Sequence, residues 1–360
     1  MKYSPFRHLG SVFYKRAPIQ FTFFVTRRCN ARCPFCFYLS RKNKSGDDQP
    51  ELSLDEIQKI SGSLGNLLWV AFSGGEIFLR NDLVAITEIF YKQNKPAIIL
   101  FPTNGLLTGT IREKTEQILR KCPKSTIVVK LSLDGPEYLH DAIRGVEGSY
   151  QKTMETCQAL GELLEKYPNF DLGINSVFCL ANQDKMQGLI DSVSRLEHVR
   201  THTVSLIRGQ VTDGKQKEVD LDKYRQTIEI MESNLKKKLA GRYRFKGARL
   251  KAAQDILQRR LIYETARQQK QQLPCYAGRL NLVLTEVGDL YPCESFSMLY
   301  GNVRNDGYDI RKLLKTKEAK TIQHAIKEKG CFCTHECYFM TNILFNPWQY
   351  PALAKEYLQL

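Results

Sequence analysis

Three cysteines stand within eight residues of this sequence, at Cys29, Cys33 and Cys36 of the stretch "RRCNARCPFCFY". Clustered thiolates are the usual ligands of an iron–sulfur cluster, and three of them would leave one iron open to a ligand that is not protein. The alternative is a structural zinc site, which takes four protein ligands in closed tetrahedral geometry. The nearest further candidate upstream is His8, at 29 − 8 = 21 residues from Cys29. The spacing therefore favours a cluster over zinc.

The other cysteines form a second group and a scattered set. There are 11 cysteines among the 360 residues. We expect a cytoplasmic protein, because the first twenty residues hold no signal-peptide run and no segment offers ~18 consecutive apolar residues. In a reducing compartment, clustered cysteines are more often metal ligands than disulfides. The second group is Cys275, Cys293, Cys331, Cys333 and Cys337, and we expect the isolated Cys122, Cys157 and Cys179 to be buried core thiols.

The elements that must position the first group alternate along the first 210 residues. Short apolar runs are separated by amphipathic stretches, which is the pattern of βα units around a parallel sheet. Predicted strands are 21–26, 67–72, 97–101, 126–133, 171–178 and 202–207, with helical periodicity at 55–64, 82–92 and 150–166. Six such units predict a partial (β/α)6 barrel or strongly curved sheet. Chemistry in these folds gathers at the carboxyl ends of the strands.

Candidate ligand-binding residues follow these strands. Gly74, Gly75 and Glu76 of "SGGE" come after the second strand, where glycines allow close backbone approach and a carboxylate can accept from an ammonium. Later strand ends carry Asn104 of "TNG", Ser132 and Asp134 of "LSLDG", and Asn175. Ser132 and Asp134 alternate onto one face and could reach a ribose. Phe35 could shield a cluster or pack on an aromatic ligand, and Arg144 could meet a carboxylate.

With these motifs in order, the sequence resembles the radical SAM superfamily, whose hallmark is CxxxCxΦC with Φ aromatic. The chain matches it as Cys29-Asn-Ala-Arg-Cys33-Pro-Phe35-Cys36. The resemblance implies a [4Fe–4S] cluster whose open iron chelates S-adenosylmethionine. It also implies reductive cleavage to a 5′-deoxyadenosyl radical and abstraction of hydrogen from a substrate carbon. Glu76 would then hold the methionyl amino group, and Arg144 the methionyl carboxylate.

The C-terminal cysteines extend the resemblance to SPASM and twitch domains, which carry auxiliary [4Fe–4S] clusters. Cys275, then Gly288 with Cys293 five residues later, match the opening of that motif. Five cysteines suffice for one cluster and not for two, so a shortened domain with one auxiliary cluster is expected. Cys275, Cys293 and Cys337 would be ligands, with Cys331 or Cys333 as the fourth. A zinc ribbon is the alternative.

These expectations divide the chain into five parts. They are an N-terminal strap (1–19), a core barrel (20–211), a basic helical connector (212–272), a small cysteine-rich α+β domain (273–345) and a tail (346–360). The net charge is +15, and between residues 235 and 272 twelve Lys or Arg stand against two acids. Such a run is usually a solvated helix face. It is also compatible with an anionic partner.

The functional expectation is a radical SAM enzyme that matures a peptide or protein and takes its electron from a donor such as flavodoxin or ferredoxin. An anionic small molecule or lipid headgroup is the second substrate class, and contact with a membrane surface stays open. The absence of a recognisable RNA-binding module argues against a nucleic-acid partner. A noncatalytic iron–sulfur or zinc scaffold with a basic binding surface is the alternative from another class. The sequence does not indicate which residue acts catalytically on the substrate.

Overall fold

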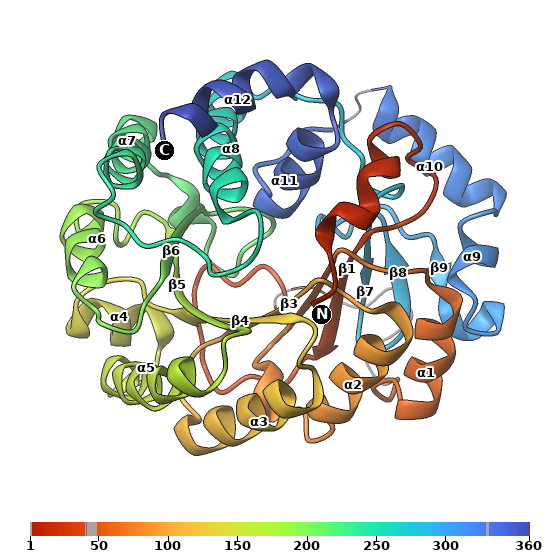
Figure 1. Ribbon diagram of the computed structural model, residues 1–360, viewed down its shortest axis with the longest axis horizontal. Coiled ribbons are helices and arrows are strands. Elements are labelled where there is room, and N and C mark those ends of the chain that lie inside the picture. Colours follow the sequence, from red (N-terminus) through yellow and green to blue (C-terminus); the bar gives the residue numbers. More distant parts are fainter. Residues whose placement is uncertain (1, 40, 42–48, 329–330) are drawn as a thin grey trace.

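One curved sheet organises the molecule (Figure 1). The computed structural model describes residues 2–39, 41, 49–328 and 331–360. Within these ranges nine strands join in the order β6-β5-β4-β3-β2-β1-β7-β8-β9. They are β1 (Gln20–Thr26), β2 (Trp69–Gly74), β3 (Ile98–Thr103), β4 (Thr126–Ser132), β5 (Phe170–Phe178), β6 (Thr201–Leu206), β7 (Asn281–Leu284), β8 (Asp289–Tyr291) and β9 (Gly301–Asn302).

The six N-terminal strands pair in parallel, as the alternating pattern predicted. Their connecting helices cover the outer face of the sheet (Figure 1). The helices in this part are α1 (Leu54–Ser63), α2 (Leu83–Asn94), α3 (Thr108–Lys121), α4 (Glu137–Arg144), α5 (Ser149–Lys166) and α6 (Met186–Ser194). This is the parallel α/β arrangement of a partial barrel.

The later helices complete the molecule beyond β6. They are α7 (Leu221–Lys236), α8 (Ala248–Gln268), α9 (Ile310–Leu313), α10 (Lys317–Lys327), α11 (Glu336–Leu344) and α12 (Tyr350–Leu358). Short 3₁₀ turns lie at η1 (Pro5–Val12), η2 (Ile77–Leu79), η3 (Gly214–Lys217), η4 (Val303–Asp306) and η5 (Pro347–Gln349). No helix among the described residues is long and apolar enough to cross a bilayer.

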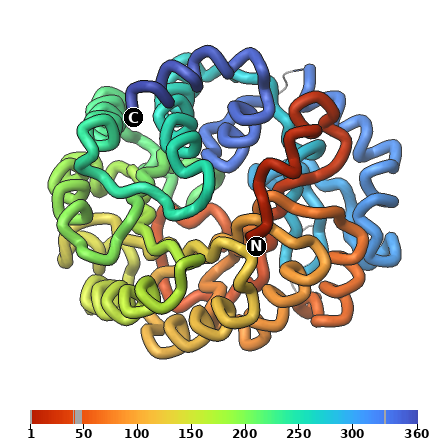
Figure 2. The backbone as a smooth tube through the Cα atoms, in the orientation of Figure 1, coloured from red at the N-terminus to blue at the C-terminus, as the bar shows by residue number. Residues whose placement is uncertain are grey.

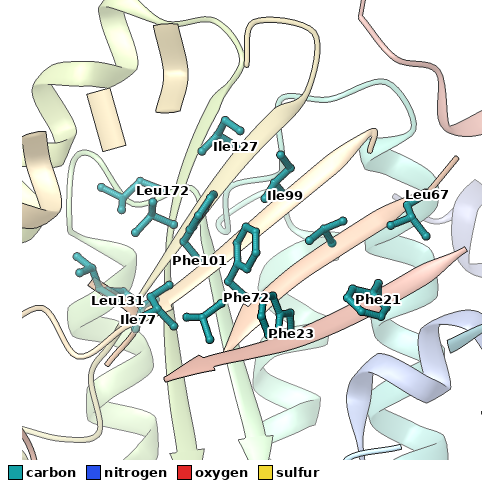
Figure 3. Packing of buried hydrophobic residues seen from close by; sticks show 14 of the residues in the cluster. Phe21, Phe23, Leu67, Phe72, Ile77, Ile99, Phe101, Ile127, Leu131 and Leu172 are labelled. Atoms are coloured by element: carbon teal, nitrogen blue, oxygen red, sulfur yellow. The ribbon is translucent and has the colours of Figure 1, made fainter. Parts of the chain in front are cut away.

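The main core lies between the strands and their covering helices (Figure 3). Strand β1 sends Phe21 and Phe23 into this core, and both are fully buried. Phe72 and Phe101 from the next two strands stack against each other with ring centroids 5.3 Å apart. Because side chains alternate along a strand, the polar residues between these aromatics face the inside of the curve. The covered face therefore holds the main core, while the inner face carries smaller apolar clusters together with polar residues such as Thr22 and Lys130.

The C-terminal strands continue the barrel sheet. Strand β7 pairs in parallel with β1, matching Gln20 to Asn281, and forms an antiparallel hairpin with β8. Gly288 in the turn has φ of 93°, a conformation that favours glycine. Sequence periodicity did not predict the pairing of β7 with β1. Because of this pairing, the sheet continues across the domain boundary expected at residue 273.

The chain termini pack on this frame (Figure 2). In the N-terminal strap, Tyr3 donates its backbone N–H to the carbonyl of Lys124 at 2.8 Å, and Arg7 donates to the carbonyl of Leu67 at 2.7 Å. These contacts lie at the amino ends of β2 and β4. The strap therefore closes the end of the barrel opposite to the carboxyl ends of the strands.

Candidate functional site

A cleft with a cavity volume of about 210 Å³ lies at the carboxyl ends of β1 to β6. Every one of these strands, or the loop after it, supplies part of the lining. The residues predicted for the site that line it are Cys29, Cys33, Phe35, Cys36, Gly74, Gly75, Glu76, Asn104, Ser132, Arg144 and Asn175. Asp134, also predicted as a ligand-facing residue, is not part of the lining.

The cysteine loop is fastened to the neighbouring strand by backbone hydrogen bonds. Gly75 donates to the carbonyl of Thr26 and Glu76 to that of Arg28, both at 2.8 Å. A Cβ on Gly74 would clash with the Thr26 carbonyl, and one on Gly75 with the Arg28 carbonyl. These two glycines were expected to admit a ligand. In the structure they let the end of β2 approach the chain that leads into the cysteines.

Glu76 is held in a fixed position at the base of the cleft, with only 1% of its surface exposed. Its Oε1 accepts from the Thr103 hydroxyl at 2.8 Å and the Phe78 N–H at 3.1 Å, and its Oε2 accepts from the Asn104 N–H at 2.8 Å. Burial raises the pKa of Glu76, and these hydrogen bonds oppose the rise. Oε2 has one lone pair free of the contacts named here and can accept from a cationic ligand.

Arg144 places a buried cation beside the cysteines. Its guanidinium lies over the Phe35 ring at 5.5 Å and has one nitrogen 3.5 Å from the Cys33 sulfur. Burial alone would lower the pKa of Arg144, but Asp134 and Cys33 outweigh it and raise that pKa. A permanent cation at this position favours the thiolate form that binds metal.

The prediction that Asp134 faces a ligand needs correction. The side chain is fully buried, and its carboxylate accepts from Arg144 and from the Val177 N–H, the latter at 2.8 Å. The prediction placed Asp134 on the same strand face as Ser132. Strand β4 ends at Ser132, so the alternation of side chains along a strand does not extend to Asp134. Asp134 is therefore a residue that positions Arg144.

Arg208 is a cleft residue that the sequence analysis missed. It follows β6 in "LIRG", so the same rule about strand ends would have found it. It lies over the Phe37 ring at 5.4 Å and reaches Glu294 at 3.6 Å. The Nε atoms of Arg208 and Arg144 are both buried without a hydrogen-bond partner among the described residues. Two orphaned donors lining one cleft fit an anionic group such as a carboxylate.

The three cleft thiols suit a cluster on chemical grounds. All are partly exposed, and the pKa values of Cys29 and Cys33 are raised, chiefly by burial. The Leu39 N–H points at the Cys36 sulfur at 3.4 Å, a contact that tunes a metal-bound sulfur. Among the described residues, no three Cys, His, Asp or Glu side chains converge as ligands of a single metal ion do. Thiols that hold a cluster bind different irons, so they need not share one point.

Most of the C-terminal cysteines lie near one another. Cys275, Cys293 and Cys333 pack against a small buried cluster that contains Tyr338. Burial raises the pKa of Cys275 to about 11 and that of Cys333 to about 12, and neighbouring thiols including Cys331 add to both. The four thiols are therefore electrostatic neighbours.

Cys337, also predicted as a ligand, is buried on α11. The charged groups with most effect on its pKa are Glu294 and Arg208, after burial. Its role as a cluster ligand stays a prediction. The isolated Cys122, Cys157 and Cys179 are buried, as predicted.

A polar contact joins the two cysteine groups. Glu294 lies next to Cys293, accepts from Arg208 of the cleft, and lies 3.4 Å from His335 Nε2. The His335 ring in turn meets Phe37 of the first cysteine loop edge-on at 6.1 Å. The loop of the first cysteine group and the segment that carries the second group are therefore in contact.

Comparison with known protein families agrees with this geometry. The model of the radical SAM superfamily matches residues 23–174, which run from β1 into β5. The match includes the loop that carries Cys29, Cys33 and Cys36, and so agrees with the resemblance found in the sequence. Members of the superfamily use a [4Fe–4S] cluster and S-adenosylmethionine. The radical SAM domain therefore contains the cysteine loop and four of the six strand ends that form the cleft.

Two proteins of known role have sequences similar to this chain. The antilisterial bacteriocin subtilosin biosynthesis protein AlbA of Bacillus subtilis is 25% identical over 333 residues, which cover 88% of this chain and 65% of that protein. Sporulation killing factor maturation protein SkfB of the same organism is 23% identical over 155 residues, covering 43% of this chain and 36% of that protein. This chain thus spans less than two thirds of the length of these relatives.

Solved structures share the fold at low sequence identity. Streptococcus suis SuiB bound to precursor peptide SuiA has a TM-score of 0.59 and 16% identity, covering 88% of this chain and 70% of that one. Native anSMEcpe with bound AdoMet and Kp18Cys peptide also has a TM-score of 0.59, with 15% identity, covering 95% of this chain and all of that one. The radical SAM fold extends in these comparisons well beyond residue 174.

Proposed function

We propose that this chain is a radical SAM enzyme that modifies a peptide or protein. The observation that carries the proposal is the cleft itself, where three thiols, a buried carboxylate and two guanidinium groups meet at the carboxyl ends of six parallel strands. A scaffold that only bound a metal would not need this set of ligand-facing charges.

In this proposal Cys29, Cys33 and Cys36 hold the [4Fe–4S] cluster. When bound, the reduced cluster and S-adenosylmethionine supply reductive cleavage of a carbon–sulfur bond and the radical chemistry that follows. The protein positions the reactants and excludes water. Phe35 and Arg144 cover one side of the thiols, and the glycines of β2 fix the loop.

The remaining cleft residues bind S-adenosylmethionine by complementary charge. Glu76 accepts from the methionyl ammonium through its spare lone pair, while Arg144, oriented by Asp134, donates to the carboxylate. Asn104, Ser132 and Asn175 line the cleft at the ends of the next three strands and provide polar contacts for the nucleoside. Arg208 supplies a further donor from the sixth strand.

Residues 273–345 would carry one auxiliary [4Fe–4S] cluster. Cys275, Cys293, Cys331 and Cys333 are its proposed ligands. Cys337, near Glu294, is the alternative ligand. Its proximity to the cleft suits either electron transfer from a product radical or direct contact with substrate. The first electron would come from a donor such as flavodoxin or ferredoxin.

The relatives support a peptide substrate. SuiB and anSMEcpe were each captured with a peptide, and AlbA takes part in biosynthesis of a bacteriocin. The cleft of this chain opens to solvent and is bordered by apolar residues such as Leu206, Ile207 and Val177. Such a border can accept a peptide side chain beside a bound nucleoside.

Anaerobic reconstitution tests the proposal. About eight irons per chain are expected for two [4Fe–4S] clusters, together with formation of 5′-deoxyadenosine that depends on a reductant. Bound zinc, or iron without cleavage of S-adenosylmethionine, would instead show a scaffold. Incubation with short peptides and with anionic small molecules, followed by mass spectrometry, separates the two substrate classes.

A further inference from the structure

A second cavity lies along the free edge of β6, away from the cysteine cleft. Its cavity volume is about 90 Å³, and it is lined by α6, α7, α8 and the loop 239–243. These helices surround the outer side of β6 in Figure 1. The cavity uses residues 201–203 at the start of β6, whereas the cleft uses residues 206–208 at its other end. The two sites are therefore separate.

Three arginines line this second cavity, and the most buried one has an unsatisfied donor. Arg259 of α8 is only 8% exposed, and its Nη1 has no hydrogen-bond partner among the described residues. The same holds for Nε of Arg200 and for Nδ1 of His202, which also line the cavity. Buried donors are rarely left unsatisfied in native proteins, because desolvating them without a partner is unfavourable.

Cations outnumber acids in the cavity lining, where three arginines stand against Asp255. The carboxylate of Asp255 already accepts from Lys251 one turn earlier on α8. Arg242 donates to the Leu360 oxygen at 2.7 Å, and the buried Asp171 beside the cavity interacts electrostatically with Arg200. Arg259 is thus the lining arginine for which no partner is named here.

Part of the lining is apolar. It includes Ile190 and Val193 from α6 and Met231 and Leu235 from α7, all of them buried. A cavity lined by both cationic donors and aliphatic side chains is complementary to an anion that carries an apolar part.

We propose that this cavity binds a small organic anion through a carboxylate or phosphate group. Arg259 and Arg200 donate to its oxygens, and the aliphatic residues of α6 and α7 cover its body. Arginine suits this task because its planar fork meets carboxylate and phosphate oxygens in pairs. The inference is independent of the function proposed for the cleft.

Binding to the full chain tests this site. We expect saturable binding of inorganic phosphate, of hexanoate, or of both, measured by calorimetry and by thermal shift against sodium chloride at equal ionic strength. Arg259→Met should weaken binding by about tenfold or more, the effect of losing one charge-assisted hydrogen bond. Arg267→Met on the same helix is the matched control, because Arg267 is exposed and paired with Glu264. It should bind as the unmodified chain does.

The melting temperature without ligand adds an independent readout. Removing an unpartnered buried charge should leave it unchanged or raise it, whereas loss of a structural arginine lowers it. Arg200→Gln, at the half-buried wall, gives the same binding test if Arg259→Met does not fold. Equal affinity of the Arg259 variant and the unmodified chain overturns the proposal, as does the absence of any response to either anion.

Discussion

At the scale of single residues, the charge balance of the cleft depends on Arg144. Its guanidinium is buried beside Cys33 and Phe35, and its ion-pair partner is the fully buried Asp134. Asp134 also accepts from the Val177 backbone, which ties the loop after β4 to β5. One buried carboxylate thus holds both the cation and the neighbouring strand in place.

Asp134→Asn should destabilise the fold strongly, because it leaves the Arg144 cation buried without a counter-charge. Loss of one partner of a buried ion pair costs about 3–5 kcal/mol of unfolding free energy. Urea denaturation of the apo-protein measures this effect. Glu137→Gln, an exposed substitution on α4, is the control and should change the unfolding free energy by less than about 0.5 kcal/mol. Equal midpoints for both variants would show that Asp134 does not have this role.

Gly75→Ala should displace the cysteine loop while leaving every proposed ligand in place. The added methyl group has no room beside the Arg28 carbonyl, so the chain before Cys29 must move. We expect reduced iron incorporation on reconstitution, with loss concentrated in the cluster of the cleft. Gly62→Ala on α1 is the matched control, since the nearest atom to its new Cβ is 3.8 Å away. Normal iron content in the Gly75 variant would contradict this explanation of the double glycine.

At the scale of elements, helix α1 connects the barrel to the C-terminal part of the sheet. Ser53 and Glu56 form a capping box at its start. Glu56 also accepts from Arg304 at 2.7 Å and from the Tyr308 hydroxyl at 3.1 Å, both near η4. A residue of the capping box therefore also joins segments about 250 residues apart in the sequence.

Glu56→Gln should lower the unfolding free energy at pH 7 by about 1–2 kcal/mol, because it removes charge-assisted bonds and keeps a residue able to complete the capping box. The Arg304 hydrogen bond lowers the pKa of Glu56 from 4.5 to about 2. The folded-state pKa lies below the unfolded value, so the stabilisation is present above pH 4.5 and is lost as pH falls toward 2.

The difference in stability between the unmodified chain and Glu56→Gln should therefore shrink across that pH range. Denaturation series at pH 7, 4 and 3 measure it. Arg304→Gln should remove the same interaction, so the double variant should be less destabilised than the sum of the single variants. A difference that stays constant with pH, or strict additivity, would show that the ion pair contributes nothing.

At the scale of the whole molecule, much of the basic excess in residues 235–272 serves internal contacts. Lys236 and Arg260 converge on the buried Glu356 of α12, at 3.1 and 2.7 Å. Arg244 donates to the carbonyl of Leu164 at 3.0 Å. These cations fasten the C-terminal helix and the connector to the barrel, so the local charge count overstated the free basic surface.

The sequence was sufficient to predict the parallel strands and most of the cleft residues at their carboxyl ends. Hydrophobic runs and strand-end motifs are local signals, and they located Glu76, Ser132 and Asn175 on one cleft. The pairing of β7 with β1 and the buried role of Asp134 depend on contacts between distant segments. Periodicity within one segment carries no information about such contacts.

The most direct test of the account is electron paramagnetic resonance of the reduced, reconstituted protein with and without S-adenosylmethionine. The account predicts a cluster signal that changes when the ligand is added. A variant with Ala at Cys29, Cys33 and Cys36 should keep the auxiliary signal and lose that change. A ligand-dependent change that survives in the triple variant, or none in the unmodified chain, would contradict the assignment of these three cysteines.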